Sequence, residues 1–399
     1  MMEKNKTALG ELACLFLKLG VTAFGGPAAH IAMMEDEVVT RRKWIDSGHF
    51  LDMVGATNLI PGPNSTEMAI HIGLLRAGWR GAVVAGACFI IPAVTLTTCL
   101  AWLYVLSGSV PSMAPFFRGV KPAVIMIVLN ALWRLGRKGI KTYSNCIVAC
   151  VAVFLCIVGV NPLACLFFGG VLGLLLNVVN PAKHFLWLCV GLVNFGFMVV
   201  NGVSTCTGFI GSFFHSAALS AVQKTESVSL FKIMLFFLKV GAILYGSGYV
   251  LMAFIEEELV ISNQWISSSQ LVDAIAVGQL TPGPVLSTAA FIGFLLAGMS
   301  GAFIAAVSIF APSFLFVGVL PLLIDRLRAS KMTSAFLDGV NSSVVVIMGT
   351  VLCKLAWTLS WGWQAFCIAG ISGVCVFKLK INNAVLILGA GILGLILWR

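Results

Sequence analysis

The sequence predicts an all-α polytopic membrane protein built from two inverted-topology repeats, and three observations support this. Of the 399 residues, 59% are hydrophobic and 10% are charged, whereas about 25% of an ordinary soluble chain is charged. Many apolar windows approach the length of about 20 residues that a helix needs to cross a bilayer. The third observation is that one half of the chain repeats the other. We expect roughly 10–12 membrane helices, some of them broken or re-entrant.

The composition also excludes several classes of function. The 25 basic and 15 acidic residues give a net charge of +10, but the basic residues stand in small groups between apolar runs. This distribution is typical of cytoplasmic loops and not of a nucleic-acid-binding face. No two of the twelve cysteines have CxxC spacing, so we interpret them as buried apolar side chains and predict neither a metal site nor a cofactor. Nucleotide-binding and hydrolase motifs are missing, and we predict that the chain is not an enzyme.

An internal repeat sets the domain organisation. Phe16–Gly20 recurs as Phe237–Gly241, and Pro61-Gly62-Pro63 recurs as Pro282-Gly283-Pro284, at the same offset of 221 residues. Beyond the second motif the offset becomes 220. We therefore predict a first repeat over residues 10–180, a linker over 181–230 with windows for further membrane helices at 185–200 and 205–222, and a second repeat over 231–399.

The loop charges predict that the two repeats have opposite orientations. Arg41-Arg42-Lys43 follows the first helix of the first repeat, while residues 257–269 of the second repeat carry no basic residue. In a later loop the bias is reversed, because residues 324–331 carry three basic residues and residues 105–117 carry none. Since positive loops stay in the cytoplasm, matching loops lie on opposite sides.

Interrupted helices in inverted repeats are typical of the substrate sites of secondary transporters. The first interruption is Gly25-Gly26-Pro27, opposite Tyr245–Gly248. The second is Pro-Gly-Pro, which we place at the tip of a re-entrant helical hairpin because its flanking segments are too short to span. The amides of Asn64, Ser65 and Thr66, which follow Pro63, are expected to point unpaired out of a helix N-terminus, and this favours an anion. A cation site built from freed carbonyls and a purely structural kink remain alternatives.

Charged residues inside the apolar helices complete the predicted site. Lys18 and Lys239 recur at equivalent positions, either as counter-charges of an anion or as side chains that reach the interface. Glu67 follows the first tip and either exchanges a proton during transport or stabilises its own helix. Asp52 and Asp273 are N-caps or ion-pair partners. The residues predicted to bind the substrate are Lys18, Gly25, Gly26, Pro27, Pro61, Gly62, Pro63, Asn64, Ser65, Thr66, Lys239, Pro282, Gly283, Pro284, Ser287 and Thr288.

The motifs of the first repeat resemble those of the chromate ion transporter family. They are Phe24-Gly25-Gly26-Pro27 with His30, then Arg41–Trp44, then Asn58–Glu67, and the resemblance covers essentially the whole chain. It implies a secondary active transporter that exports chromate, a divalent tetrahedral oxyanion, across the bacterial inner membrane, driven by the membrane potential or a proton gradient. Its partners would be the oxyanion and the lipid bilayer and no nucleic acid, and a homodimer stays open. The alternatives are uptake or exchange of sulfate or another anion, and a membrane-embedded enzyme acting on lipid phosphates.

Overall fold

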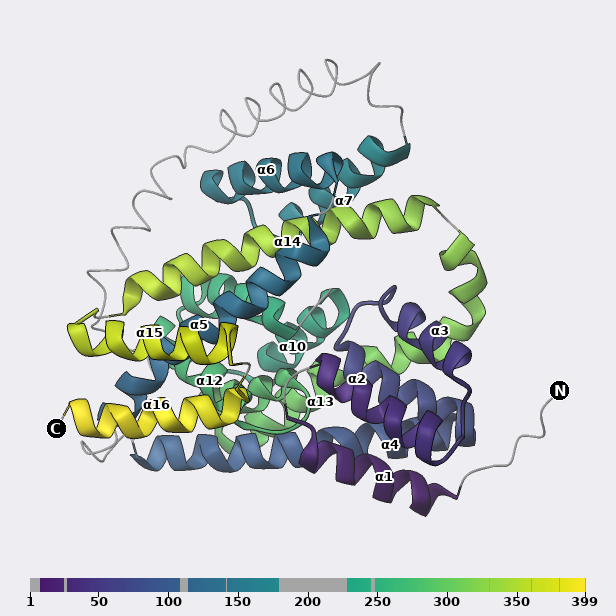
Figure 1. The fold of residues 1–399 in the computed structure, drawn as a ribbon, viewed down its shortest axis with the longest axis horizontal. Helices are drawn as coiled ribbons and strands as arrows, with labels where there is room; N and C mark the ends of the chain where they lie inside the picture. Colours follow the sequence, from purple (N-terminus) through teal and green to yellow (C-terminus); the bar gives the residue numbers. More distant parts are fainter. Residues whose placement is uncertain are drawn as a thin grey trace. The chain divides into compact units, whose positions relative to one another are not determined.

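A computed structural model describes residues 8–24, 27–107, 114–140, 142–178, 228–244, 248–329, 331–359, 361–379 and 381–398. All regular structure in these ranges is helical, which confirms the predicted fold class (Figure 1). The windows predicted at 185–200 and 205–222 lie outside the described residues. The chain forms two compact units: Met1–Asn130 with Ser227–Asp325 and Leu359–Arg399, and Ala131–Glu226 with Arg326–Thr358.

The helices follow one another in matching order in the two repeats. The first repeat holds α1 (Leu9–Thr22), α2 (Pro27–Glu35), the π-helix η1 (Asp36–Arg41), α3 (Ser47–Thr57), α4 (Asn64–Ser107), α5 (Ala114–Gly139), α6 (Tyr143–Val158) and α7 (Pro162–Val178). The second holds α10 (Leu230–Ile243), η3 (Gly248–Val250), α11 (Leu251–Ile255), the π-helix η4 (Glu256–Ser262), α12 (Ser268–Leu280), η5 (Val285–Ser287), α13 (Thr288–Ala329), α14 (Lys331–Thr358), α15 (Trp363–Phe377) and α16 (Asn383–Leu397).

The first membrane segment of each repeat is broken where the sequence predicts it. In the first repeat α1 ends at Thr22 and α2 begins at Pro27, which suits a first helical position because proline has no N–H to satisfy there. In the second repeat α10 ends at Ile243 and helical structure resumes at Gly248. Gly25, Gly26 and residues 245–247 lie outside the described residues.

The helices that enter the hairpins are capped by other residues than the sequence predicts. Asp46 caps α3 by accepting a hydrogen bond from the His49 N–H at 2.9 Å, and this bond lowers the pKa of the Asp46 carboxyl. Ser267 caps α12 in a capping box with Gln270. The N-cap role predicted for Asp52 and Asp273 is therefore wrong, because both lie inside their helices and the extended backbone of a cap comes earlier.

Each Pro-Gly-Pro motif is followed by a short helical segment that then reverses direction. The α4 helix is interrupted at Ala77 and Gly78, and Gly78 has φ +64°, which a residue with a β-carbon rarely adopts. Gly73 before the turn and Gly81 after it lie face to face, each against the other's carbonyl group. The second repeat has the same break at Ala297 and Gly298 within α13. The segment after the tip is thus separate from the longer helix, as predicted for a re-entrant hairpin.

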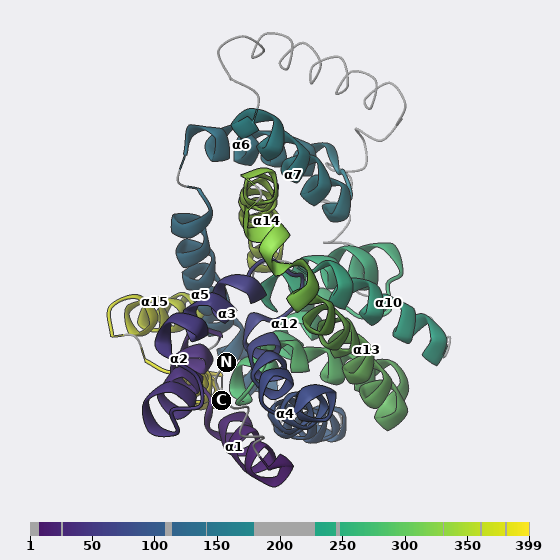
Figure 2. The same cartoon turned by 90° about the vertical axis from the view of Figure 1, so that its right-hand side faces the viewer.

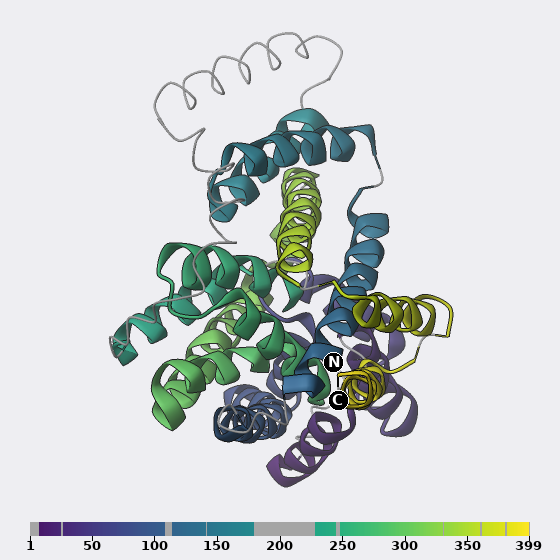
Figure 3. The same cartoon turned by 90° about the vertical axis from the view of Figure 1, so that its left-hand side faces the viewer.

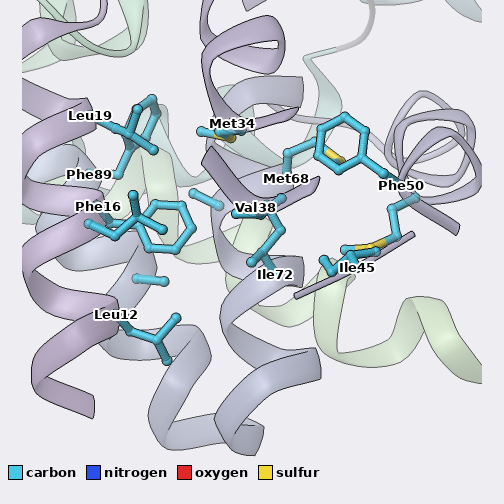
Figure 4. Packing of buried hydrophobic residues seen from close by; sticks show 14 of the residues in the cluster. Leu12, Phe16, Leu19, Met34, Val38, Ile45, Phe50, Met68, Ile72 and Phe89 are labelled. Carbon is cyan, nitrogen blue, oxygen red and sulfur yellow. The ribbon is translucent and has the colours of Figure 1, made fainter. Parts of the chain in front are cut away.

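A hydrophobic cluster fixes the first hairpin beside α1 (Figure 4). Phe16 and Leu19 of α1 pack with Phe89 from the second part of α4, and Phe50 of α3 packs in the same cluster as Met68 of α4. Gly20 lets α1 approach closely, since a β-carbon there would lie 2.8 Å from the Phe89 carbonyl oxygen. Close packing at small residues is the main source of helix association in lipid, where apolar side chains gain little by leaving lipid for protein.

Each of the two units contains helices of both repeats. In the first unit, Gly119 of α5 packs against the backbone of α16 at Ala390 and Gly394, so a first-repeat helix contacts a second-repeat helix. In the second unit, Gly339 of α14 packs against Gly169 of α7 in the equivalent way. Helices α6 and α7 pack on α14 there (Figures 2 and 3). In both units, small residues thus mediate contacts between a helix of one repeat and a helix of the other.

Within the part of the chain that the structure describes, four helices are long and apolar enough to cross a membrane. They fall within residues 64–106, 115–137, 285–320 and 332–357. Shorter apolar helices accompany them, and large side chains such as Phe303 and Leu315 of α13 are more than 60% exposed. Together with the composition, these features identify a multi-pass membrane protein.

Candidate functional site

The two Pro-Gly-Pro tips lie inside the first unit and not at its surface. Gly62, Pro63 and all three residues of the second motif are buried, while Pro61 is partly exposed. After each motif the third residue turns its N–H back onto the last proline: Thr66 donates to the Pro63 carbonyl at 2.8 Å, and Ser287 donates to the Pro284 carbonyl at 3.0 Å. The expectation that the Thr66 amide is free is therefore wrong.

Two amides at each tip remain available for a ligand. The N–H groups of Asn64 and Ser65 make no hydrogen bond within the described residues, and the same holds for Val285 and Leu286 at the second tip. These four groups are equivalent between the repeats. They lie at the start of α4 and of the η5–α13 segment, where the positive ends of the helix dipoles are.

Each tip is fastened to the broken first helix of the other repeat. The Gly62 N–H donates to the Leu244 carbonyl at 2.6 Å, just after α10 ends, and the Gly283 N–H donates to the Ala23 carbonyl at 2.9 Å, just after α1 ends. Leu244 and Ala23 are 221 residues apart, like the two glycines. The interruptions of the two repeats therefore meet in one two-fold arrangement.

Buried polar side chains at the first tip have no protein partner. Both carboxylate oxygens of Glu67 and the Thr66 hydroxyl make no hydrogen bond within the described residues, although both residues are 0% exposed. The Ser313 hydroxyl of α13 is unpaired in the same way. Glu67 and Ser313 both lie beside Gly62, where a β-carbon would come within 2.8 Å of the Ser313 oxygen. This tip is a cluster of unsatisfied oxygen atoms that can bind a proton or a cation.

The second tip has hydroxyl groups instead of a carboxyl. Thr281 lies 3.4 Å from the hydroxyl of Ser287 and 3.4 Å from that of Thr97, which comes from α4 of the first repeat. Thr288, the counterpart of Glu67, donates to the Val285 carbonyl at 2.8 Å. The two halves of the site are therefore alike in backbone and different in charge.

The two repeated lysines each contact a glutamate of their own repeat. Lys18 lies 2.7 Å from Glu37, and Lys239 lies 2.7 Å from Glu258. Their side chains are 58% and 41% exposed. The pairs join α1 to η1 and α10 to η4 across the broken helices. A role of either lysine as the counter-charge of an anion stays a prediction.

His30 lies at the site although it is not among the residues predicted to bind the substrate. Its Nε2 donates to the Ala23 carbonyl at 3.0 Å, the same oxygen that accepts from Gly283. The ring is 1% exposed and packs edge-on to Phe89. Ser313 and Thr97 were missed as well, and their only signal was a hydroxyl within a long apolar helix. Pro27, which starts α2, is the described part of the first predicted interruption.

The comparisons with known proteins agree with this arrangement of two similar halves. A family model described as "Chromate transporter" matches residues 10–174 and again residues 231–395. A "Probable chromate transport protein" of Synechococcus elongatus is 30% identical over 98% of this chain and 96% of its own length. A "Chromate transport protein" of Pseudomonas aeruginosa is 30% identical over 96% of this chain and 91% of its own length.

A more distant relative is an uncharacterized transporter of Methanocaldococcus jannaschii, 27% identical over 99% of this chain and 96% of its own length. No solved structure matches the chain significantly. The family model covers most of the chain in its two matches, and the relatives align from end to end. The chain therefore belongs to the chromate transporter family.

Proposed function

We propose that this protein is a secondary active transporter that exports chromate across the bacterial inner membrane, driven by the membrane potential or a proton gradient. The observation that carries the proposal is the reciprocal fastening of two buried tips, Gly62 to Leu244 and Gly283 to Ala23. It gathers two pairs of free amides and two positive helix ends in one unit, which favours a tetrahedral oxyanion. The family membership supports chromate as that anion.

The energetics of the proposal follow from charge alone. Moving an anion out of a cell with a negative interior is favoured by about 2.3 kcal/mol per charge for each 100 mV. A dianion that leaves together with one proton still carries one net negative charge outward. The membrane potential therefore favours export in both cases.

Flux measurements in vesicles test the proposal. The purified protein is reconstituted in lipid vesicles, a membrane potential is imposed, and chromate movement is followed with unlabelled sulfate or phosphate as competitor. We expect chromate flux that follows the potential and that is lost in vesicles without protein. Sulfate flux without chromate flux would assign another anion, and phosphate release from a lipid substrate without any flux would replace transport by an enzyme.

The role of the repeated lysines is tested by opposing variants of one ion pair. Both Lys18→Met and Glu37→Gln break the contact of 2.7 Å, but only the first removes a positive charge. If Lys18 is a counter-charge, Lys18→Met loses chromate flux at least about tenfold, which corresponds to about 1.4 kcal/mol, while Glu37→Gln keeps it. Equal flux in the two variants would mean that Lys18 serves only its ion pair with Glu37. At this exposure such a pair stabilises the fold by about 1 kcal/mol or less.

A further inference from the structure

A buried ionic cluster lies away from the tips, where α12 meets two first-repeat helices. Asp273 of α12 is 3% exposed. Its Oδ2 accepts a hydrogen bond from the Tyr104 hydroxyl of α4 at 3.0 Å, and its Oδ1 lies 3.7 Å from Nζ of Lys121 of α5. The Lys121 ammonium donates to the Ser269 hydroxyl at 2.6 Å. Oδ2 of the carboxylate therefore has a hydrogen bond, while Oδ1 makes none within the described residues.

This cluster differs from the two repeated lysine–glutamate pairs of the same protein. Lys18–Glu37 and Lys239–Glu258 have contacts of 2.7 Å, are partly exposed and occur in both repeats. The Asp273–Lys121 contact is 1.0 Å longer, and the carboxyl is buried. Keeping a buried carboxylate ionised without a full set of hydrogen bonds costs free energy, so burial favours the protonated form.

The residues that surround Asp273 are not repeated at the equivalent positions of the sequence. Asp52, the counterpart of Asp273, is exposed, and Gly48 stands in place of Ser269. Asn341 and Ile324 stand at the positions equivalent to Lys121 and Tyr104. The counterparts of Tyr104, Lys121 and Ser269 cannot provide the same surroundings for Asp52, whereas the two lysine–glutamate pairs occur in both repeats. The asymmetry points to a function in the transport cycle.

The surroundings of α12 contain few other titratable groups. The π-helix η4 contributes Glu256, whose carboxylate accepts from the Ser268 hydroxyl at 3.5 Å at the start of α12. The sequences of α11, η5 and α16, which also pack near α12, contain no ionisable side chain. Tyr104 and Lys121 are thus the groups that face the Asp273 carboxyl directly.

We propose that Asp273 binds and releases a proton during the transport cycle, and that Lys121 and Tyr104 set its charge. The proton adds to Oδ1, the oxygen that has no hydrogen bond, so the carboxyl becomes neutral. Lys121 then keeps its bond to Ser269 but no longer faces a negative charge. The inference rests on the proposed transport function and adds a proton site on the second repeat, distinct from the tips.

The test compares Asp273→Asn with Asp52→Asn, its exposed counterpart, in the full-length protein. In vesicles we expect the maximal chromate flux of the wild type to change with pH, and one titrating step to vanish in Asp273→Asn but not in Asp52→Asn. Tyr104→Phe removes a donor to the carboxylate and should move that step upward by about one pH unit. Thermal unfolding in detergent verifies that the variants are folded.

A second measurement makes the test independent of the substrate. Infrared difference spectra of the purified protein record carboxyl groups as they take up protons, without any flux. We expect one protonation band to be lost in Asp273→Asn and kept in Asp52→Asn. A wild-type spectrum and pH profile in Asp273→Asn would overturn the inference. Absence of flux in the wild type would count against the proposed function, and the infrared result would still decide about Asp273.

Discussion

Gly62→Ala is expected to abolish chromate flux and to lower the thermal stability of the protein. Gly62 has φ +140°, where a β-carbon is strained, and that β-carbon would meet the Glu67 carboxylate and the Ser313 hydroxyl. A residue with a β-carbon in such a sparsely populated backbone region costs about 1–3 kcal/mol, and overpacking of a filled site costs about 1–3 kcal/mol more. The displaced tip would also lose its hydrogen bond to Leu244. Flux in vesicles and unfolding in detergent measure the two effects.

Two other glycine variants are matched controls for this prediction. Gly389→Ala lies in α16 with open space around the new β-carbon and should leave flux and stability unchanged or slightly improved. Gly283→Ala at the second tip has φ +85°, but its β-carbon would lie 3.1 Å from that of Ala93, so we expect a smaller loss. Wild-type flux and stability in Gly62→Ala would contradict the assignment of this tip as the substrate site.

Glu67→Gln is expected to make the apparent affinity for chromate independent of pH. Glu67 is fully buried beside the first tip with both oxygens unpaired. At an effective dielectric constant of about 20, an ionised carboxylate about 4 Å from a charge of the anion opposes binding by about 4 kcal/mol. In the wild type a proton must neutralise Glu67 when the anion binds, so the affinity should rise as pH falls. The glutamine variant is neutral throughout and should bind tightly at every pH.

The measurement is the concentration of chromate that gives half-maximal flux, taken across a range of pH. Glu67→Asp keeps an ionisable group and should retain a pH-dependent affinity, which separates loss of charge from loss of shape. If Glu67→Gln shows the wild-type dependence on pH, Glu67 does not carry the coupled proton. The maximal flux reports on Asp273 instead, so the two proton sites are measured by different quantities.

Much of the fold follows from local patterns in the sequence. The breaks after Thr22 and Ile243, the two hairpin tips and the all-helical architecture were predictable, because apolar length, proline and glycine act within a few residues. The repeated offset between Pro61 and Pro282 fixed which segments correspond. The opposite orientation of the repeats in the membrane stays a prediction from loop charges.

The composition of the site was only partly predictable. Pro-Gly-Pro and Glu67 stand in one continuous motif, so their proximity follows from the sequence. The Lys18–Glu37 pair joins residues 19 positions apart across a broken helix, which no periodic pattern specifies. His30 has no histidine counterpart in the second repeat, so the repeat does not indicate it, although it shares the Ala23 carbonyl with Gly283.

The sequence alone determined that this chain is a helical membrane protein with two similar halves and buried interruptions, since these features depend on hydropathy and backbone chemistry. Only the tertiary structure decided that each tip is fastened to the other repeat, that Ser313 lies beside Gly62, and that Asp273 pairs loosely with Lys121. These contacts join residues about 150 to 260 positions apart. The packing of whole helices brings such residues together and sets the distances between them.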